Sequence, residues 1–73
     1  MDLRQLRYFV AVAHLLNFSR AAESLHISQS TLSQQIAELE AELGGPLFLR
    51  NKRSVRITDA GMALLEEGES LLY

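Results

Sequence analysis

The clearest pattern in the sequence is a helical repeat of apolar residues between positions 28 and 43. Its apolar positions are spaced four, three and four apart, which places them on one side of an amphipathic helix: Leu32, Ile36, Leu39 and Leu43. The acidic residues come only in the second half, and the other side of the first turns carries short neutral side chains: Gln29, Ser30, Ser33 and Gln34. An uncharged, hydrogen-bonding N-terminal end is suited to contact with a polyanion, so we interpret this helix as a recognition helix.

Two shorter helical repeats precede it, over residues 2–16 and 19–25. Asp2 is of the type that caps a helix N-terminus, and Asn17 tolerates the left-handed conformation that ends one. We therefore expect Asp2 to begin the first helix and Asn17 to stop it. Ser19 is the expected N-cap of the second helix.

A connection of about three residues separates the second helix from the recognition helix, which is the helix-turn-helix arrangement. Ser28 is the expected N-cap of the third helix, and Ile27 is placed to fill the corner between the helices. If one residue of the turn has a positive φ, the candidates are His26 and Ser28.

The sequence after the third helix predicts a β-hairpin. Gly44, Gly45 and Pro46 end the helix, because glycine accepts the left-handed conformation and proline cannot continue a helix. Residues 47–50 and 55–58 then have the character of two short strands, joined by a basic tip at residues 51–54. The predicted fold class is mainly α, a winged helix-turn-helix of three helices and a two-stranded wing, followed by the start of a linker helix.

A last helix is expected from Asp59 onward, capped by Thr58. Its apolar side chains exceed what one face of so small a core can cover, and this excess favours a dimer interface. We assign the dimer contact to Met62, Leu65 and Leu72. A helical protein-interaction module, docking a partner through the same Leu-rich helix without DNA, is the alternative.

Composition narrows the class of protein. The chain has 73 residues, 48% of them apolar and none of them cysteine, which is typical of one small domain without disulfides or thiolate metal sites. The two histidines are too isolated for a metal site, and no nucleophile triad or phosphate-binding glycine loop is present. We expect no enzyme, no cofactor and no membrane association, and a cytoplasmic location.

The charge distribution matters more than the net charge of −2, which alone argues mildly against nucleic acid. Four cations lie within seven residues at the wing: Arg50, Lys52, Arg53 and Arg56. Acidic clusters lie elsewhere, at residues 38–42 and 66–69. A basic wing tip is expected, although a run of this kind also occurs as a solvated hairpin.

Taken in order, these motifs resemble the N-terminal DNA-binding domain of LysR-type transcriptional regulators over essentially all 73 residues. The resemblance rests on a series at family spacing: Leu6-Arg7-Tyr8-Phe9, Asn17 to Ala22, Leu25 to Ser30, Leu32 to Ile36, Leu39-Glu40, Leu43-Gly44, Pro46-Leu47-Phe48 with Arg50, and Thr58 to Gly61. Ser30 and Gln34 depart from the family, which often has proline and arginine there. The missing cation leaves Gln34 better suited to adenine.

The resemblance implies a bacterial regulator that binds double-stranded DNA as a dimer or tetramer. The third helix is expected in the major groove, the wing at the adjacent minor groove, and the last helix against that of a second copy. Residues 1–58 would form the DNA-binding domain and residues 59–73 the start of the linker helix. A small-molecule effector would bind only in a C-terminal domain that this chain lacks.

The resemblance also assigns roles to individual residues. Base readout is expected from the first turns of the third helix: Gln29, Ser30, Thr31 and Gln34, with the two amides matched to the N6/N7 edge of adenine. Contacts to the DNA backbone are expected from Ser19, Arg20, Ser33, Arg50 and Lys52. Arg53 is the minor-groove candidate, since Arg favours narrow A·T-rich grooves. The alternative for Ser19 is a plain helix cap, and the alternative for Arg50 is a structural ion pair. For Ser30, Thr31 and Ser33 the alternative is an exposed polar side chain that does not contact DNA.

Overall fold

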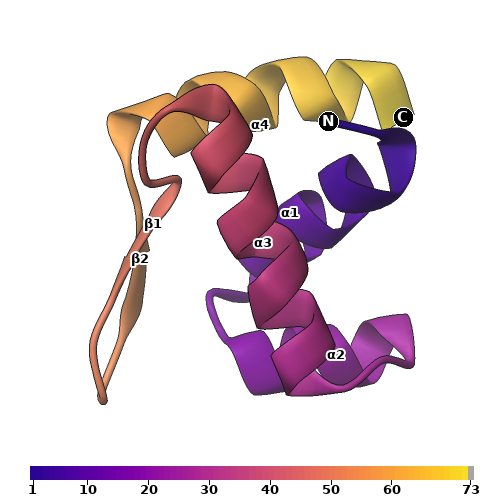
Figure 1. The fold of residues 1–73 in the computed structure, drawn as a ribbon, viewed down its shortest axis with the longest axis vertical. Coiled ribbons are helices and arrows are strands. Elements are labelled where there is room, and N and C mark those ends of the chain that lie inside the picture. The colour runs from indigo at the N-terminus through magenta and orange to yellow at the C-terminus, as the bar shows by residue number, and fades with distance from the viewer. Residues whose placement is uncertain (73) are drawn as a thin grey trace.

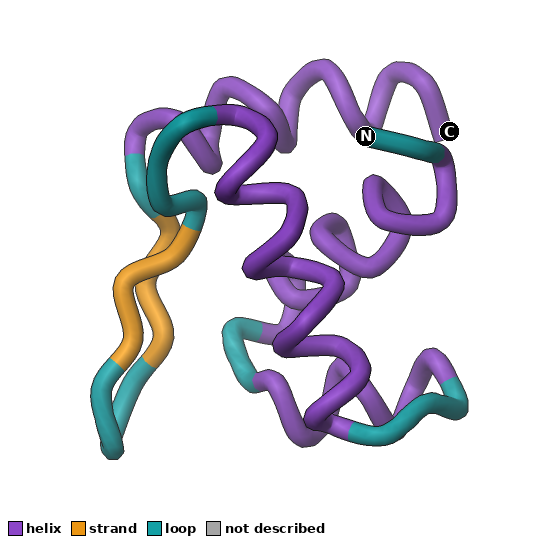
Figure 2. Tube along the Cα trace, in the orientation of Figure 1, coloured by secondary structure: helices purple, strands orange, loops and turns teal. Residues whose placement is uncertain are grey.

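The computed structural model describes residues 1–72, which form four helices and one two-stranded antiparallel sheet (Figure 1). In chain order these are α1 Leu3–Leu15, α2 Phe18–Leu25, α3 Gln29–Leu43, β1 Phe48–Arg50, β2 Val55–Ile57 and α4 Asp59–Leu72. Figure 2 shows the two strands and their tip projecting from the helical body as a wing. The predicted winged helix-turn-helix is confirmed.

Three of the predicted helix caps are present as expected. The Asp2 carboxylate accepts a hydrogen bond from the Gln5 backbone N–H at 2.7 Å. The Ser28 hydroxyl accepts from the Thr31 N–H at 3.1 Å, and the Thr58 hydroxyl accepts from the Gly61 N–H at 3.0 Å. Each satisfies a backbone donor that the first turn of a helix leaves unpaired.

The predicted junction between the first two helices was wrong. α1 ends at Leu15, and Leu16 takes the left-handed conformation, with φ 48°. Asn17 does not stop α1; its side chain accepts from the Arg20 N–H at 2.9 Å and caps α2 in place of Ser19. Beginning the helix at Phe18 leaves that ring only 5% exposed, so burial selects the earlier cap.

The turn of the helix-turn-helix follows one of the two expected alternatives. His26 has φ 59°, whereas Ser28 has φ −73°. The Ile27 N–H donates to the Ala22 carbonyl oxygen at 3.0 Å, and its side chain packs against the core. Gly44, with φ 86°, ends α3 as predicted.

The core lies where α1, α2, α3 and the base of the wing meet. Its most completely buried large side chains are Leu6, Phe9, Val12, Leu32, Leu39 and Leu47. The Phe48 ring, on β1, lies 5.3 Å from that of Phe9 and 6.0 Å from that of Phe18, measured between ring centroids. These aromatic contacts fix the base of the wing to the helical body.

The wing itself is short. Phe48 pairs with Ile57, and Arg50 with Val55. Pairing continues beyond the strands, since the Thr58 N–H donates to the Leu47 carbonyl at 3.0 Å. Each strand is one residue shorter than predicted.

α4 packs across α1 at the end of the molecule opposite the wing tip (Figure 1). A β-carbon built on Gly68 would lie 3.0 Å from the Leu6 Cδ1 atom, so the two helices approach closely there. Leu65 and Leu72 pack partly against the core of the same chain, whereas Met62 and Leu71 are 45% and 70% exposed. Tyr73 lies outside the described residues.

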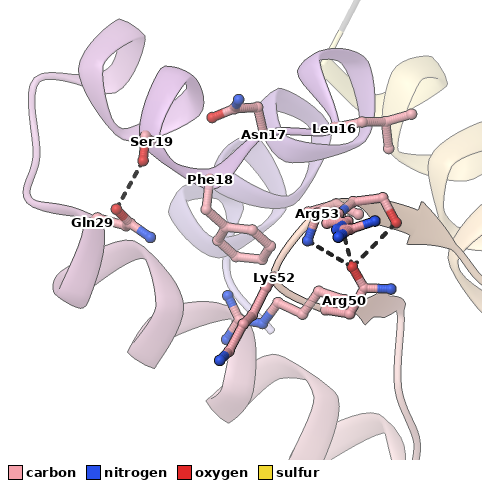
Figure 3. A pocket seen from close by; sticks show the side chains of 11 residues that line it. Leu16, Asn17, Phe18, Ser19, Gln29, Arg50, Lys52 and Arg53 are labelled. Carbon is pink, nitrogen blue, oxygen red and sulfur yellow. Dashed lines mark hydrogen bonds between the residues drawn. The ribbon is translucent and has the colours of Figure 1, made fainter.

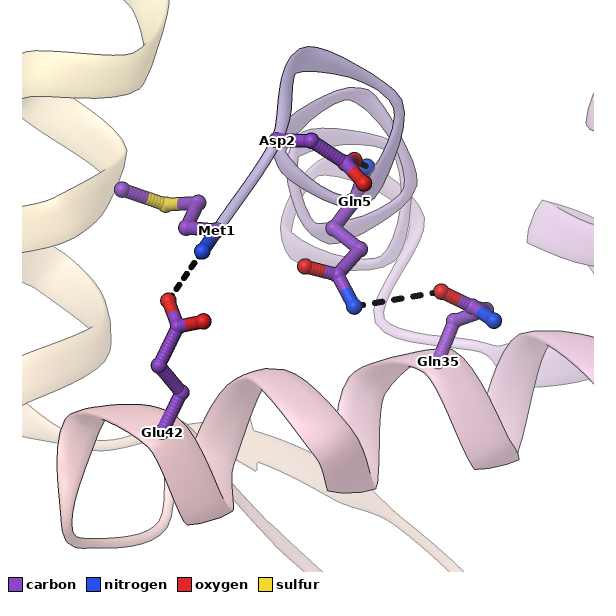
Figure 4. A network of polar contacts seen from close by, with 5 residues as sticks. All are labelled: Met1, Asp2, Gln5, Gln35 and Glu42. Atoms are coloured by element: carbon purple, nitrogen blue, oxygen red, sulfur yellow. Dashed lines mark hydrogen bonds and ion pairs between the residues drawn. The ribbon is translucent and has the colours of Figure 1, made fainter.

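Polar contacts join the helices at the same end (Figure 4). The Gln5 amide donates to the Gln35 Oε1 atom at 3.2 Å, and the Met1 amino group pairs with Glu42. The His14 Nε2 atom lies 2.8 Å from a Glu69 carboxylate oxygen and links α1 to α4.

None of the helices in residues 1–72 is long and apolar enough to cross a membrane.

Candidate nucleic-acid interface

The front of α3 is open to solvent along its first turns. Leu32 and Ile36 are buried, and the predicted base-readout side chains on the other side are all exposed: Gln29, Ser30, Thr31 and Gln34. This exposed surface is called the α3 front below. It is carried by the N-terminal part of α3, which lies toward the same end of the molecule as the wing tip (Figure 1). A surface of this shape presents neutral donors and acceptors beside a basic projection.

Hydroxyl groups at the start of α3 are paired with one another. The Ser28 hydroxyl lies 2.8 Å from that of Thr31 and 3.2 Å from that of Ser30. The capping serine therefore orders both hydroxyls that were predicted to meet a base or a phosphate.

The wing tip is shaped by Asn51, a residue that the sequence analysis did not single out. Its Oδ1 atom accepts from the backbone N–H groups of Arg53 at 2.7 Å and Ser54 at 2.9 Å. Such Asx turns are a common signal in loops, and an asparagine at the start of the tip could have indicated one. The turn leaves the Lys52 and Arg53 side chains exposed.

Arg50 connects the wing to both helices of the helix-turn-helix. Its guanidinium carbon lies 4.1 Å from the centre of the Phe18 ring, and its Nη1 atom donates to the Ser33 hydroxyl at 3.3 Å. A cation over an aromatic face is worth about 0.5–1 kcal/mol at an exposed site. Arg50 and Ser33, both predicted to contact phosphate, are thus joined to each other, and they fix the distance between wing and α3.

A cleft of about 220 Å³ separates the start of α2 from the wing (Figure 3). It brings together five of the predicted site residues: Ser19, Gln29, Arg50, Lys52 and Arg53. Arg20 lines a separate hollow, with Glu23 and His26. The positive dipole end of α2 adds to the positive potential that the three wing cations create in the cleft.

Glu40 positions the wing from the other side and was also missed. Its Oε2 atom accepts from the backbone N–H groups of Leu47 at 2.7 Å and Phe48 at 3.3 Å. The carboxylate thereby joins the last turns of α3 to the first strand. The helical period places Glu40 beside the buried stripe and Glu38 away from it, but this period does not show that the Glu40 carboxylate reaches the wing.

The family model of the bacterial regulatory helix-turn-helix proteins, lysR family, matches residues 3–62. The chain belongs to the lysR family.

Two similar regulators illustrate this membership. The LysR-family chain is 56% identical, over 72 residues, to the Hca operon transcriptional activator HcaR of Escherichia coli K12. This match covers 99% of the chain and 24% of HcaR. It is also 56% identical over 72 residues to the transcriptional regulator BudR of Klebsiella aerogenes, where the match covers 99% of the chain and 50% of the relative. The chain spans about a quarter to a half of the length of these relatives.

Solved structures have the same fold. A CbnR DBD–DNA complex superposes with a TM-score of 0.94 at 44% identity, covering 99% of this chain and 83% of that one. A complex of the BenM DBD with catB site 1 DNA gives a TM-score of 0.94 at 46% identity. This match covers 99% of this chain and 80% of the BenM chain. Both of these neighbours are domains solved in complex with DNA.

Charge in the LysR-family domain is separated along its length. The wing cations lie at one end, whereas Glu66, Glu67 and Glu69 lie on the half of α4 farther from the wing (Figure 1). Within residues 1–72, no group of three or more metal-ligating side chains is close enough to hold a metal ion. The end that carries the α3 front is therefore the end suited to a polyanion.

Proposed function

We propose that this chain is the sequence-specific DNA-binding domain of a transcriptional regulator, with α3 in the major groove and the wing at the adjacent minor groove. The observation that carries the proposal is the placement of the neutral α3 front beside the basic wing at one end of a lysR-family fold. An α-helix fits the major groove, and a helix with polar, uncharged first turns can approach base edges without repelling phosphates.

Within this proposal the contacts divide by chemistry. Gln29, Ser30, Thr31 and Gln34 face the bases, and Arg20, Ser33 and Lys52 lie where backbone phosphates would pass. The Ser19 hydroxyl is bonded to Gln29 instead. Arg53, held at the tip by the Asn51 turn, enters the minor groove. Because Arg50 lies over Phe18 and bonds Ser33, it acts on DNA binding mainly by fixing the wing.

Two copies would pair through α4 and present two recognition helices to successive major grooves. Met62 is 45% exposed and available for that contact, and Leu65 and Leu72 offer the part of their surface that their own core leaves open. Half-sites would then be spaced by about one helical turn of DNA or a multiple of it. In the division proposed here, residues 1–58 bind DNA and residues 59–73 begin the linker helix. Any effector would bind outside this chain, and the regulator would be cytoplasmic.

Salt dependence tests DNA binding directly. If about three phosphates are neutralised per copy, affinity for duplex DNA should fall by roughly 40-fold between 50 and 200 mM salt, because counterions are released on binding. Fluorescence anisotropy with a labelled A·T-containing duplex measures this. Replacing Lys52 and Arg53 with alanine should flatten the slope, whereas Arg4→Ala, on the exposed side of α1, should not. Absence of binding at low salt would refute the proposal.

The division of labour has its own test. Gln29→Ala should relax preference at one base pair by about tenfold, because one base contact is worth about 1–3 kcal/mol. Arg53→Ala should instead weaken binding broadly or at A·T flanks, because the minor groove distinguishes few sequences. Selection from a randomised duplex library at fixed salt measures both profiles. Equal losses on every sequence from both variants would contradict the assignment.

A further inference from the structure

A hydrogen bond joins the two helices of the helix-turn-helix at the edge of the cleft. The Ser19 hydroxyl, in the first turn of α2, donates to the Gln29 Oε1 atom at 2.9 Å (Figure 3). Ser19 is free to do so because Asn17, not Ser19, caps α2. Both side chains are exposed at the proposed DNA-facing end.

The Gln29 amide has a defined polarity in this bond. Its oxygen points toward the start of α2, and its Nε2 atom points away from Ser19 (Figure 3). The positive end of the α2 dipole and the nearby wing cations favour a carbonyl oxygen over an amino group at that place. Because a serine hydroxyl can accept as well as donate, this local potential is what keeps the amide oxygen, rather than the Nε2 atom, beside Ser19.

Gln34 provides the contrast within the same helix. It is exposed one and a half turns further along α3, and no hydrogen bond to its side chain occurs within residues 1–72. Its amide can turn over and offer either a donor or an acceptor, whereas that of Gln29 is held.

We infer that Ser19 is a specificity-determining positioning residue, which holds Gln29 so that it presents a hydrogen-bond donor to the base. This inference rests on the proposed DNA binding. With its oxygen engaged by Ser19, Gln29 selects a major-groove edge made of acceptors, such as O6 and N7 of guanine or O4 of thymine. It disfavours cytosine, whose N4 amino group is a donor, and differs from the bidentate adenine contact that the sequence suggested.

The test compares Ser19→Ala with Ser19→Thr by selection from a randomised duplex library. The relevant base pair is the one at which Gln29→Ala removes the wild-type preference. There, the wild-type chain should prefer guanine or thymine, and Ser19→Ala should lower that preference about fivefold and admit adenine and cytosine. Ser19→Thr, which keeps the hydroxyl, should retain the wild-type profile. Affinity for unrelated duplex should stay within twofold among the wild-type chain, Ser19→Ala and Ser19→Thr.

A double variant separates positioning from direct contact. In a Gln29→Ala background, Ser19→Ala should cause no further change, because its effect passes through the amide. Equal loss on every sequence, additive with Gln29→Ala, would show a phosphate contact instead and overturn the inference. So would a Gln29-dependent preference for adenine in the wild-type chain.

These outcomes are distinct from failure of the proposed function. A wild-type chain that binds no duplex would overturn both proposals. Sequence-specific binding by the wild-type chain, with an unchanged profile in Ser19→Ala, would overturn this inference alone. Thermal unfolding of Ser19→Ala should match the wild-type chain, since the Asn17 cap remains.

Discussion

Replacing Gly61 with alanine should lower the free energy of unfolding by about 3 kcal/mol, because the added methyl group has no room. Gly61 is buried in the first turn of α4, where the wing returns to the helical body. A β-carbon there would lie 2.4 Å from the Leu47 carbonyl oxygen and 2.6 Å from the Ile57 Cγ1 atom. The carbonyl belongs to the backbone and cannot rotate away, so α4 would have to shift from the base of the wing.

Urea or thermal unfolding measures this loss, which corresponds to a fall in Tm of roughly 15 °C for a two-state domain of this size. Gly68→Ala is the matched control, since it adds the same methyl group to the same helix. Its nearest neighbour is the terminal Cδ1 atom of Leu6, which can rotate, and alanine recovers about 1 kcal/mol of helix propensity. Gly68→Ala should stay within about 1 kcal/mol of the wild-type chain, and equal losses in both variants would contradict this reasoning.

Glu40→Ala should destabilise the domain by about 2–3 kcal/mol and weaken DNA binding as well. The substitution leaves the Leu47 and Phe48 N–H groups without their carboxylate acceptor in a partly buried position. Hydrogen bonds to a charged group are worth about 1.5–3 kcal/mol, and an unpaired buried donor costs a similar amount. Because these two donors begin the wing, its basic tip should lose its fixed position relative to α3.

Glu38→Ala is the control for this experiment. It removes the same charge from the same helix, but Glu38 is exposed, so stability should hardly change and DNA affinity should rise slightly as repulsion of phosphates falls. Glu40→Gln, which keeps one carbonyl oxygen as acceptor, should lie between the two. The assignment fails if Glu40→Ala has the same free energy of unfolding and the same DNA affinity as Glu38→Ala.

Most of the fold could be predicted because its signals are local. The apolar stripe of α3, the caps at Asp2, Ser28 and Thr58, and the left-handed Gly44 each depend on residues within about four positions. The second strand is predicted in the same way, since Val55 and Ile57 alternate with the polar Arg56. Such signals predict which elements form and roughly where they end.

The site was predicted less completely. The exposed α3 front and the basic wing tip follow from the sequence, because a helix period separates exposed from buried positions and a polar turn lies at the surface. The supports of these surfaces were not predictable: Glu40 bonds residues seven and eight positions away, and Arg50 bonds Ser33 across 17. Each depends on how two elements pack.

The junction at residues 16–19 shows most clearly which features depend on the sequence alone and which depend on tertiary packing. The sequence by itself determined that a capping residue would lie there, since Asn17 and Ser19 are both of the capping type. Only the tertiary structure decided between them, since α2 begins at Phe18 in the arrangement that packs the Phe18 ring against Phe48. Because Asn17 caps α2, the Ser19 hydroxyl can donate to Gln29, ten residues away. This contact exists only once the two helices are packed.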